Sequence, residues 1–313
     1  MTLKLLFIML FVNILSSFAQ NDSISNSIVK DYDDKVTVTV YNLKTSNGFV
    51  IISGQGANEQ YFNLTPNYKS QLGISLAYQF IDVSFSFAPK FFPGNKDNAD
   101  SKLMSFNYNL FLKKWVQSFT YIHQKGFSID ESDFSFPLPD MRTTKIGTTT
   151  SYVFNDNFSY KTVLNQNAWQ RKSSGSFIPK FSFYYTHLNF GSDFDNSNGN
   201  MYLFSIAPSY YYNFVIRDHF LIGPGVGFGA GINILDKDVY ALYQFDFNLK
   251  LGYNRDNFFA FLHSTAISFI QNDNAEARLD DSITSFNISV GYRFDAPKKV
   301  KKIYDRVHEK TGL

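Results

Sequence analysis

Apolar and polar residues alternate with a period of two along most of this chain, and this alternation limits the folds that it can adopt. The clearest stretch is 239–253, where every second residue is apolar or aromatic and several of the others are strongly polar. The pattern recurs over 72–80, 104–112 and 286–294. Successive side chains of a β-strand point to opposite faces, so the pattern predicts a sheet with one apolar and one polar face.

The length of these runs distinguishes between two kinds of sheet. Strands of globular proteins are usually about five or six residues long, whereas a tilted strand that crosses a membrane needs roughly 9–11. Several runs here reach the longer value, and aromatic residues end their apolar faces: Tyr78 and Phe80, Tyr152 and Phe154, Tyr210 and Tyr212, Tyr253, Tyr292 and Phe294. Such rings are typical of the membrane interface. We therefore predict an all-β fold, a single antiparallel transmembrane β-barrel.

The N-terminus predicts export. Lys4 precedes the largely apolar run 5–15, and Ser17-Phe18-Ala19 has the small residues of a cleavage site. The run is too short to cross a bilayer as a helix, so it indicates a signal peptide over 1–19 rather than an anchor; the alternative is a buried helix. No later apolar run approaches about 18 residues, so we expect no membrane-spanning helix in the mature chain.

Short and long connections alternate along the chain. Short ones are expected near Ile81, at Lys113-Lys114, Asn155-Asp156-Asn157, Arg217-Asp218 and Asn254-Arg255-Asp256, and long polar ones at 92–100, 126–140, 191–199 and 272–281. Outer-membrane barrels have short periplasmic turns and longer external loops. If short turns lie on the periplasmic side and long loops on the external side, the connections predict about fourteen strands. The count is about twelve if 36–65 form one crossing rather than three. The expected order is a periplasmic segment 20–34, the barrel 35–295 and a basic periplasmic tail 296–313.

Two segments do not fit this pattern. The outward positions within 158–190 change from even to odd numbers, as shown by Phe158, Tyr160 and Leu164 against Phe181, Phe183 and Tyr185. A bulge or break must lie between them, and the polar stretch 170–176 could be a bulge, an external turn or an excursion into the lumen. The tail over 298–304 predicts a short basic helix, either solvated or in contact with anionic lipid or a periplasmic partner.

Three short segments resemble parts of a Bacteroidetes family that is designated only as a domain of unknown function. They are Leu64-Thr65-Pro66-Asn67 with Leu72-Gly73-Ile74 and Tyr78, then Lys125-Gly126-Phe127, then Gln170–Phe177. The resemblance covers roughly 32–294, with one departure at Leu64, where the family has an aromatic residue. It implies an outer-membrane barrel and brings no activity, substrate or catalytic residue with it.

We find no strong catalytic or metal-binding signature. The glycines at 223, 225, 227, 229 and 231 alternate with larger residues, which indicates a strand with one bare face rather than a phosphate loop. If that face lines the lumen, something bulky is expected against it. His263 and Ser264 are adjacent and would point to opposite faces, so they make a poor catalytic pair. The remaining histidines, His123, His187, His219 and His308, lack the spacing of a helical metal site.

Acidic residues gather mainly in predicted loops, namely Asp130, Glu131, Asp133, Asp193, Asp195, Asp273, Glu276, Asp280 and Asp281. None shows the ligand order of an EF-hand, so we interpret them as solvated charge and predict no metal. The chain also has no cysteine, which excludes thiolate chemistry. We predict no cofactor.

Two sets of residues are candidate sites. The first could bind an anion or a lipid headgroup, or be a solvated external turn: Arg171, Lys172, Ser173, Ser174, Gly175 and Ser176. The second would line the lumen and set its polarity, or form a buried network that closes it: Gln244, Asp246, Asn248, Lys250 and Arg293.

The leading hypothesis for function is passage or binding of a small solute or lipid at the outer membrane. The alternatives are a structural or envelope-interaction barrel with a filled lumen, and a membrane-embedded lipid-modifying enzyme that assembles Ser and His from different strands. Expected partners are outer-membrane lipid, lipopolysaccharide and, during biogenesis, the barrel assembly machinery. The 29 basic and 27 acidic residues nearly balance, which argues against a nucleic-acid partner. The sequence leaves the oligomeric state open.

Overall fold

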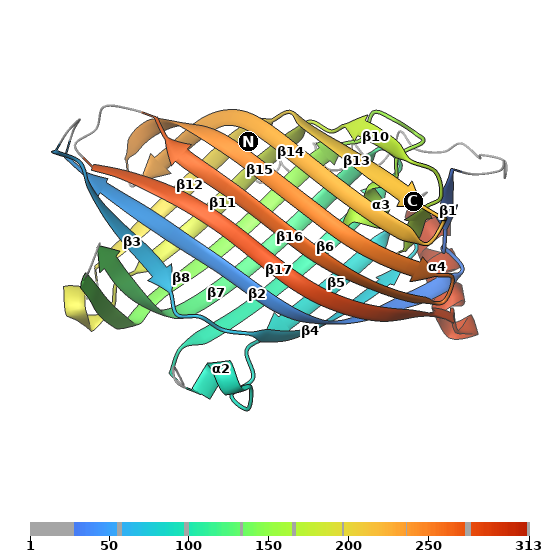
Figure 1. The fold of residues 1–313 in the computed structure, drawn as a ribbon, viewed down its shortest axis with the longest axis horizontal. Helices are drawn as coiled ribbons and strands as arrows, with labels where there is room; N and C mark the ends of the chain where they lie inside the picture. Colours follow the sequence, from blue (N-terminus) through green and yellow to red (C-terminus); the bar gives the residue numbers. More distant parts are fainter. Residues whose placement is uncertain are drawn as a thin grey trace.

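The chain forms a closed β-barrel in the computed structural model, which describes residues 28–54, 58–96, 100–131, 134–164, 167–195, 197–235, 237–272 and 277–311. Twelve antiparallel strand positions form the ring (Figure 1). The ring closes because β14 (Phe220–Leu235) pairs with β12 on one side and β15 (Asp238–Arg255) on the other. The predicted all-β barrel is confirmed, with the lower of the two strand counts.

Two of the twelve positions are strands interrupted by proline, which has no N–H to donate to a ladder. Ile178-Pro179 separates β10 from β11, and Pro208 separates β12 from β13. In ring order the wall consists of β2 (Lys35–Ser53), β4 (Gln71–Tyr78), β5 (Ile81–Phe87), β6 (Lys102–Leu112), β7 (Trp115–Glu131), β8 (Phe134–Tyr152), β10 (Ser174–Phe177) with β11 (Lys180–Asn189), β13 (Ser209–Ile216) with β12 (Asn198–Ala207), β14, β15, β16 (Phe258–Gln271) and β17 (Ala277–Asp295).

Residues 35–53 form the single long strand β2, which is why the strand count is twelve. The strand β3 (Gln60–Pro66) returns along the far part of β2 and also pairs with β7. Its chain then continues into β4, which pairs with the near part of β2. The two strands β3 and β4 therefore share one return path along the wall.

Both described chain ends lie at one end of the barrel, here called the inner end. β1 (Val29–Asp31) and α4 (Lys298–Thr311) lie there (Figure 1), together with the tight turns that begin after Tyr78, Leu112, Ile216 and Arg255. The opposite, outer end carries the short helices α2 (Pro93–Lys96) and η2 (Ser192–Phe194). The predicted signal peptide lies outside the described residues. No helix in the described ranges is both long and apolar enough to cross a membrane.

Two predicted outer loops are wrong in extent. The segment 126–140 is mostly a hairpin, because β7 continues to Glu131 and β8 begins at Phe134. Gly126 has φ of 89° and causes a register shift between Lys125 and Phe127, so the alternation changes phase there and looks like a loop in the sequence. Residues 277–281, also predicted as loop, already belong to β17.

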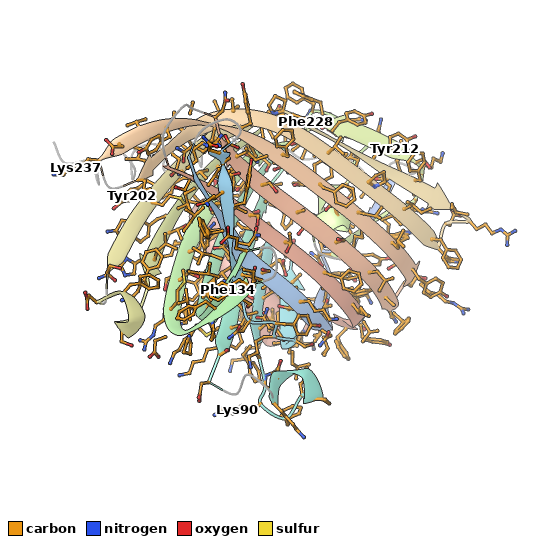
Figure 2. The ribbon with its side chains drawn as sticks, turned by 60° about the vertical axis from the view of Figure 1, so that its left-hand side comes forward. Lys90, Phe134, Tyr202, Tyr212, Phe228 and Lys237 are labelled. Carbon is orange, nitrogen blue, oxygen red and sulfur yellow. The ribbon has the colours of Figure 1, made fainter. Side chains whose placement is uncertain are left out.

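The outward side chains are apolar, as the alternation predicts. Figure 2 shows Tyr202, Tyr212 and Phe228 on the outside of the wall, and Phe228 is 63% exposed. The outward set predicted on β17 is exposed throughout: Phe286, Ile288, Val290, Tyr292 and Phe294. Such a surface is stable only when something apolar, such as lipid, covers it.

Gly225 of β14 leaves room for an aromatic ring on the inner face. A Cβ at Gly225 would lie 2.4 Å from the ring of Tyr211 on the neighbouring strand. The same arrangement recurs where Tyr41 covers Gly73, Tyr184 covers Gly147 and Phe259 covers Gly291. At Gly225 the expected bulky group against the bare face of β14 is thus a side chain of the adjacent strand, whereas Gly229 and Gly231 lie against the backbone of the chain near Ile206 and Phe204.

Replacing Gly225 by alanine should lower the free energy of unfolding by about 1–3 kcal/mol, because the Tyr211 ring must move to admit the new Cβ. That movement would also break the 2.7 Å hydrogen bond from Lys180 Nζ to the Tyr211 hydroxyl. Gly252→Ala is the matched control, since its new Cβ would meet nothing closer than 3.6 Å. Urea unfolding of the refolded barrel measures both, and equal losses would contradict the ring-over-glycine explanation.

Candidate functional site

A segment between β8 and β10 enters the barrel at the inner end and closes it. We call residues 29–33, which include β1, together with residues 153–164 and 167–173, the inner plug. It contains α3 (Tyr160–Leu164) and β9 (Ala168–Gln170), which pairs with β1. Two predictions are therefore wrong: 155–157 is not a short turn between wall strands, and 158–164 is not an outward-facing strand. The polar stretch 170–176 proves to be the exit of an excursion into the lumen.

Apolar side chains explain why this segment turns inward. Phe158, Tyr160 and Val163 are buried in a cluster with inward residues of the surrounding wall. Trp169 is also buried and packs with Tyr32 and Leu221. These rings leave water for the barrel interior, and that burial favours the plugged state.

Polar contacts fix the inner plug to several wall strands. Lys250 Nζ on β15 donates to the Val163 carbonyl at 2.8 Å, and Asn213 Nδ2 on β13 donates to the Ser159 carbonyl at 3.2 Å. Thr37 Oγ1 on β2 donates to Asn167 Oδ1 at 3.2 Å. Since these wall residues belong to separate strands, the plug is attached around the lumen rather than to one side.

The N-terminal part of the plug has its own charged contacts. The Arg293 guanidinium lies 3.8 Å from the Tyr32 ring centroid and donates to Asn254 Oδ1 at 2.7 Å. Lys161 Nζ on α3 lies 3.3 Å from Asp33 Oδ1. Burial raises the pKa of Asp33 above its ordinary value, although Lys161 acts in the opposite direction. These contacts tie the start of the barrel chain to the plug.

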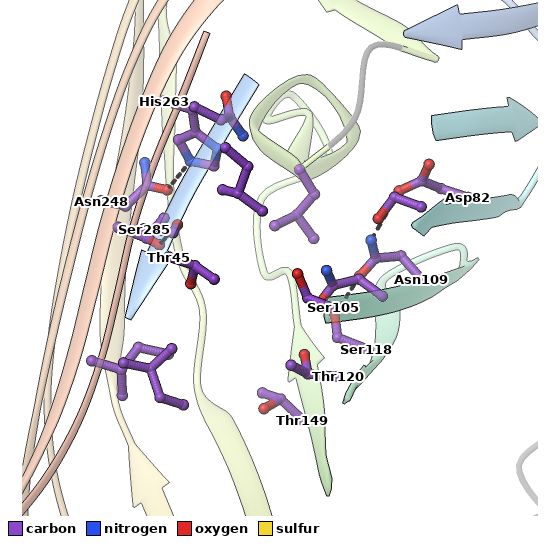
Figure 3. A pocket seen from close by; sticks show the side chains of 18 of the residues that line it. Thr45, Asp82, Ser105, Asn109, Ser118, Thr120, Thr149, Asn248, His263 and Ser285 are labelled. Carbon is purple, nitrogen blue, oxygen red and sulfur yellow. Dashed lines mark hydrogen bonds between the residues drawn. The ribbon is translucent and has the colours of Figure 1, made fainter. Parts of the chain in front are cut away.

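Above the plug lies a central chamber of about 320 Å³ (Figure 3). Tyr160 and Leu164 of α3 form part of its lining. Most of the remaining lining is serine, threonine and asparagine from many wall strands, and Figure 3 shows Ser105, Ser118, Thr120 and Thr149 among them. Short hydroxyl and amide side chains both donate and accept hydrogen bonds, so the chamber can bind polar groups of either kind.

The few ionisable groups of the chamber have close partners. Lys180 Nζ lies 3.0 Å from Asp246 Oδ2 across the lumen. The Asp82 carboxylate accepts hydrogen bonds from Ser75 Oγ at 2.6 Å and Asn109 Nδ2 at 3.0 Å. The chamber therefore contains one ion pair and one carboxylate, Asp82, whose oxygens accept hydrogen bonds from neutral side chains.

His263 also faces the chamber, and its partner is an amide rather than a serine. Its Nε2 lies 2.7 Å from Asn248 Oδ1 (Figure 3). Ser264 is the next residue of the same strand and pairs with Phe286 in the ladder. Within the described residues, none of the histidine hydrogen bonds reaches a serine hydroxyl.

Apolar side chains fill the lumen toward the outer end. We call them the outer cluster: Phe49, Leu64, Phe127, Leu138, Met141, Leu188 and Met201. Between this cluster and the chamber, Lys145 forms an ion pair with Asp281, and their side chains are 0% and 1% exposed. Asp281 is thus a buried wall residue and not the loop residue that the sequence predicted. The chamber lies between packed material on both sides.

The structure brings the predicted lumen residues together in two groups. Gln244, Asp246 and Asn248 line the chamber. Lys250 and Arg293 are fully buried beside the inner plug, so they hold it in place instead of facing open space. The sequence reasoning missed the plug residues that form the chamber floor, since a five-residue helix leaves almost no periodic signal.

The predicted anion-binding stretch lies at the inner end. Ser173 Oγ accepts a hydrogen bond from the Val215 amide at 2.9 Å, and Ser176 Oγ accepts one from the Asn155 amide at 3.1 Å. Ser174 Oγ accepts one from Asn155 Nδ2, and Gly175 belongs to β10. Arg171 and Lys172 are exposed. Anion binding here stays a prediction. The exposed Arg171 and Lys172 could contact an anion, whereas the serines already accept hydrogen bonds from the protein.

The acidic residues of the predicted loops form no cluster that the structure assigns to a metal. Among the residues described, no group of three His, Asp or Glu side chains could hold a metal ion. Asp133, Asp273 and Glu276 lie outside the described residues.

A family profile described as Domain of unknown function (DUF4421) matches residues 20–294. No curated protein matches the chain. Among solved structures, the translocator domain of the autotransporter NalP from Neisseria meningitidis is 11% identical with a TM-score of 0.43, covering 93% of this chain and 96% of that one. The COG4313 outer-membrane channel from Pseudomonas putida F1 is 10% identical with a TM-score of 0.40, covering 87% and 100%.

A third similar structure is the outer-membrane-expressed OmpT of Vibrio cholerae, 8% identical with a TM-score of 0.34, covering 89% of this chain and 100% of that one. These likenesses are too distant to carry function. The assignment to the outer-membrane class of β-barrels rests on this chain's own closed ladder and apolar outer surface.

Proposed function

This chain belongs to the family described as Domain of unknown function (DUF4421), and we propose that it is an exported outer-membrane barrel that binds and passes a small uncharged polar solute. The observation that carries this proposal is the central chamber, with its lining of hydroxyl and amide groups. The predicted signal peptide over 1–19 supplies the export that such a role requires.

The charged groups of the chamber already have partners, and this is the reason for expecting an uncharged solute. Lys180 is paired with Asp246, and Asp82 is hydrogen-bonded to Ser75 and Asn109. An anionic solute would lose its hydration on entry while Lys180 is already paired, and a cationic solute would find the carboxylates of Asp246 and Asp82 already bound. Either loss of hydration is costly in a confined space. A solute rich in hydroxyl groups can exchange its water for the serine, threonine and asparagine side chains at little cost.

The chamber size fits a compact molecule. A cavity of about 320 Å³ lies near the lower end of the range for small-molecule sites, roughly 300–1,000 Å³. A polyol or a single sugar ring belongs to this size class. Passage would then require displacement of packed side chains at both ends, and the inner plug is the more separable of the two because it is not part of the wall ladder.

Solute uptake by proteoliposomes tests the proposal. The refolded mature chain, from Gln20 onward, is incorporated into vesicles, and swelling is followed with a small polyol and with a charged solute of similar size. We expect uptake of the polyol to exceed uptake of the charged solute several-fold. Ser118→Phe should reduce polyol uptake by filling the chamber, whereas Phe119→Leu, on the outward face of the same strand, should not.

Folding must be verified by heat-modifiable gel migration, since an unfolded chain would also fail to transport. Folded wild-type protein with no uptake of either solute would reject passage. Equal uptake of both solutes would reject the selection of uncharged molecules.

The second candidate, a structural or envelope-interaction barrel with a filled lumen, is favoured by the outer cluster. Its seven members are buried to between 0% and 2% exposure. Packing of this kind stabilises a closed barrel. Folded protein that binds no solute and takes up none would favour this candidate.

A further inference from the structure

A band of basic and polar side chains crosses five adjacent strands on the outside of the wall, toward the outer end. In the ladder, Lys102 pairs with Lys125, Lys125 with Arg142, and Arg142 with Asn189. One step closer to the middle of the barrel, His123 pairs with Thr144, Thr144 with His187, and His187 with Asn200. We call these two rows the outer basic band: Lys102, Lys125, Arg142, Asn189, His123, Thr144, His187 and Asn200.

The band faces outward, away from the lumen. On each strand its members alternate with buried inward residues: Leu103 on β6, Gln124 on β7, and Thr143 on β8. Lys102 and Arg142 are exposed. The band is therefore a surface feature and has no part in the chamber.

The protein pairs only one of the three Lys and Arg side chains of the band with a carboxylate among the described residues. Lys125 Nζ pairs with Asp140 Oδ1 at 3.1 Å, with the Asp140 side chain 47% exposed. Lys102 and Arg142 form no ion pair with any residue in the described ranges. Two long cationic side chains, Lys102 on β6 and Arg142 on β8 with β7 between them, are thus available to an external anion.

Hydrogen-bonding groups lie directly beside these cations. His123 Nδ1 is 3.0 Å from Thr144 Oγ1, and His187 Nδ1 is 3.0 Å from Asn200 Oδ1. These contacts use one ring nitrogen of each histidine. The arrangement is that of a surface able to bind a phosphate by charge and by hydrogen bonds together.

Aromatic residues define the level of the band in the membrane. The row beneath it contains Tyr121, Tyr185 and Tyr202, and the last of these projects from the wall in Figure 2. The Tyr185 hydroxyl donates to Asn200 Oδ1 at 2.7 Å, so its polar end points toward the band. The next row contains Phe183 and Phe204, whose ring centroids are 4.8 Å apart.

This sequence of rows is what a membrane boundary requires. Phenylalanine rings belong in the hydrocarbon, and tyrosines belong where the rings meet lipid and the hydroxyls meet headgroups. A lipid-facing Arg or Lys costs about 2–4 kcal/mol at the bilayer midplane but roughly 0–1 near the interface. The band therefore lies at the headgroup level of the leaflet on the outer side, away from α4 and β1.

We propose that the outer basic band binds a phosphate of lipopolysaccharide in the outer leaflet, with Lys102 and Arg142 as the charged contacts. Lipopolysaccharide is chosen over a free phosphate because the cations stand directly above an apolar, lipid-covered wall. A phosphate presented there must be carried by a molecule whose acyl chains can lie along the phenylalanine row. This proposal requires the outer-membrane location and is independent of solute passage.

The test is binding of purified lipopolysaccharide to the folded barrel in detergent micelles, followed by fluorescence of a labelled lipid. Lys102→Gln with Arg142→Gln should weaken binding by about 30-fold, if each cation contributes about 1 kcal/mol as at an anionic membrane surface. Arg217→Gln with Arg255→Gln is the matched control, because it removes the same net charge from exposed positions at the inner end.

Two further arms identify the chemistry. Lipopolysaccharide whose lipid phosphates have been removed should bind wild-type protein no better than the intact lipid binds the double variant. Micelles containing phosphatidylglycerol in its place should compete poorly. Equal weakening by the control variant, equal binding of the dephosphorylated lipid, or equal competition by phosphatidylglycerol would each overturn the proposal. Gel migration before and after heating verifies that every variant is folded.

Discussion

Replacement of Lys145 by methionine is expected to lower the free energy of unfolding by about 3–5 kcal/mol, because it leaves a buried carboxylate without its counter-charge. The Lys145 and Asp281 side chains are 0% and 1% exposed. Asp281 keeps one further partner, Asn47 Nδ2 at 2.7 Å. That neutral hydrogen bond cannot replace the lost ammonium group.

The measurement is urea unfolding of the barrel in lipid vesicles, with fluorescence of its two tryptophans as the signal. The double variant Lys145→Met with Asp281→Leu should recover most of the loss, since no unpaired charge remains. Lys114→Met is the comparison at an exposed pair with Asp156, where we expect no more than about 1 kcal/mol. A loss at Lys145 no larger than that at Lys114 would refute the importance of the buried pair.

The wall of the barrel was predictable because its signal is local. In β15 and β17 the direction in which each side chain points, outward or into the lumen, follows from whether its position is odd or even. The predicted outward set on β17 is exposed in the structure. Lipid on one side and polar lumen on the other impose opposite demands on consecutive residues. The period-two pattern follows from these two environments, and it can be recognised without knowing which strands pair.

Interruptions of the ladder were less predictable, because they depend on single residues. Gly126 adopts φ of 89° and shifts the register of the β7–β8 pair, so a hairpin looked like a loop. Pro208 divides one wall strand into two without ending the crossing. In both cases the local pattern changes phase or stops, although the chain continues along the wall.

The details of the inner plug were not predictable, because the sequence pattern of its apolar residues does not distinguish them from outward wall residues. Phe158 and Tyr160 alternate as outward wall residues would, yet they pack inside the lumen. Burial inside a plug and exposure to lipid select the same side chains. An excursion into the lumen was one of the three alternatives for the stretch 170–176. The change of the outward positions from even to odd numbers within 158–190 was the signal for it.

The buried charges of the lumen were predictable as residues but not as partners. Asp246 was recognised as inward-facing, while its partner Lys180 lies 66 residues away on another strand. Lys145 and Asp281 are 136 residues apart. Which inward side chains meet across a barrel depends on strand number and stagger, and neither can be read from one strand at a time.

Tethering the inner plug to the wall should reduce polyol uptake to the level of protein-free vesicles, if the plug must move for passage. Thr37 Oγ1 and Asn167 Oδ1 are 3.2 Å apart, so cysteines at these two positions can be joined by a short bis-methanethiosulfonate reagent, from which each thiol displaces a methanesulfinate to form a disulfide. The chain has no cysteine of its own, and the two introduced thiols are therefore the only ones that react. Reductive cleavage of the tether should restore uptake in the same sample.

The control joins two wall strands by the same chemistry and leaves the plug free. Thr149 on β8 and Ser182 on β11 have hydroxyl oxygens 3.0 Å apart, and both line the chamber. A bridge there adds similar bulk, so its effect on uptake measures obstruction alone. If passage breaks the plug contacts through Lys250 and Asn167 and leaves the wall ladder intact, only the first tether should block uptake. Uptake that survives the Thr37–Asn167 tether would mean that solute moves past a fixed plug, and the inner end would then be a lining and not a gate.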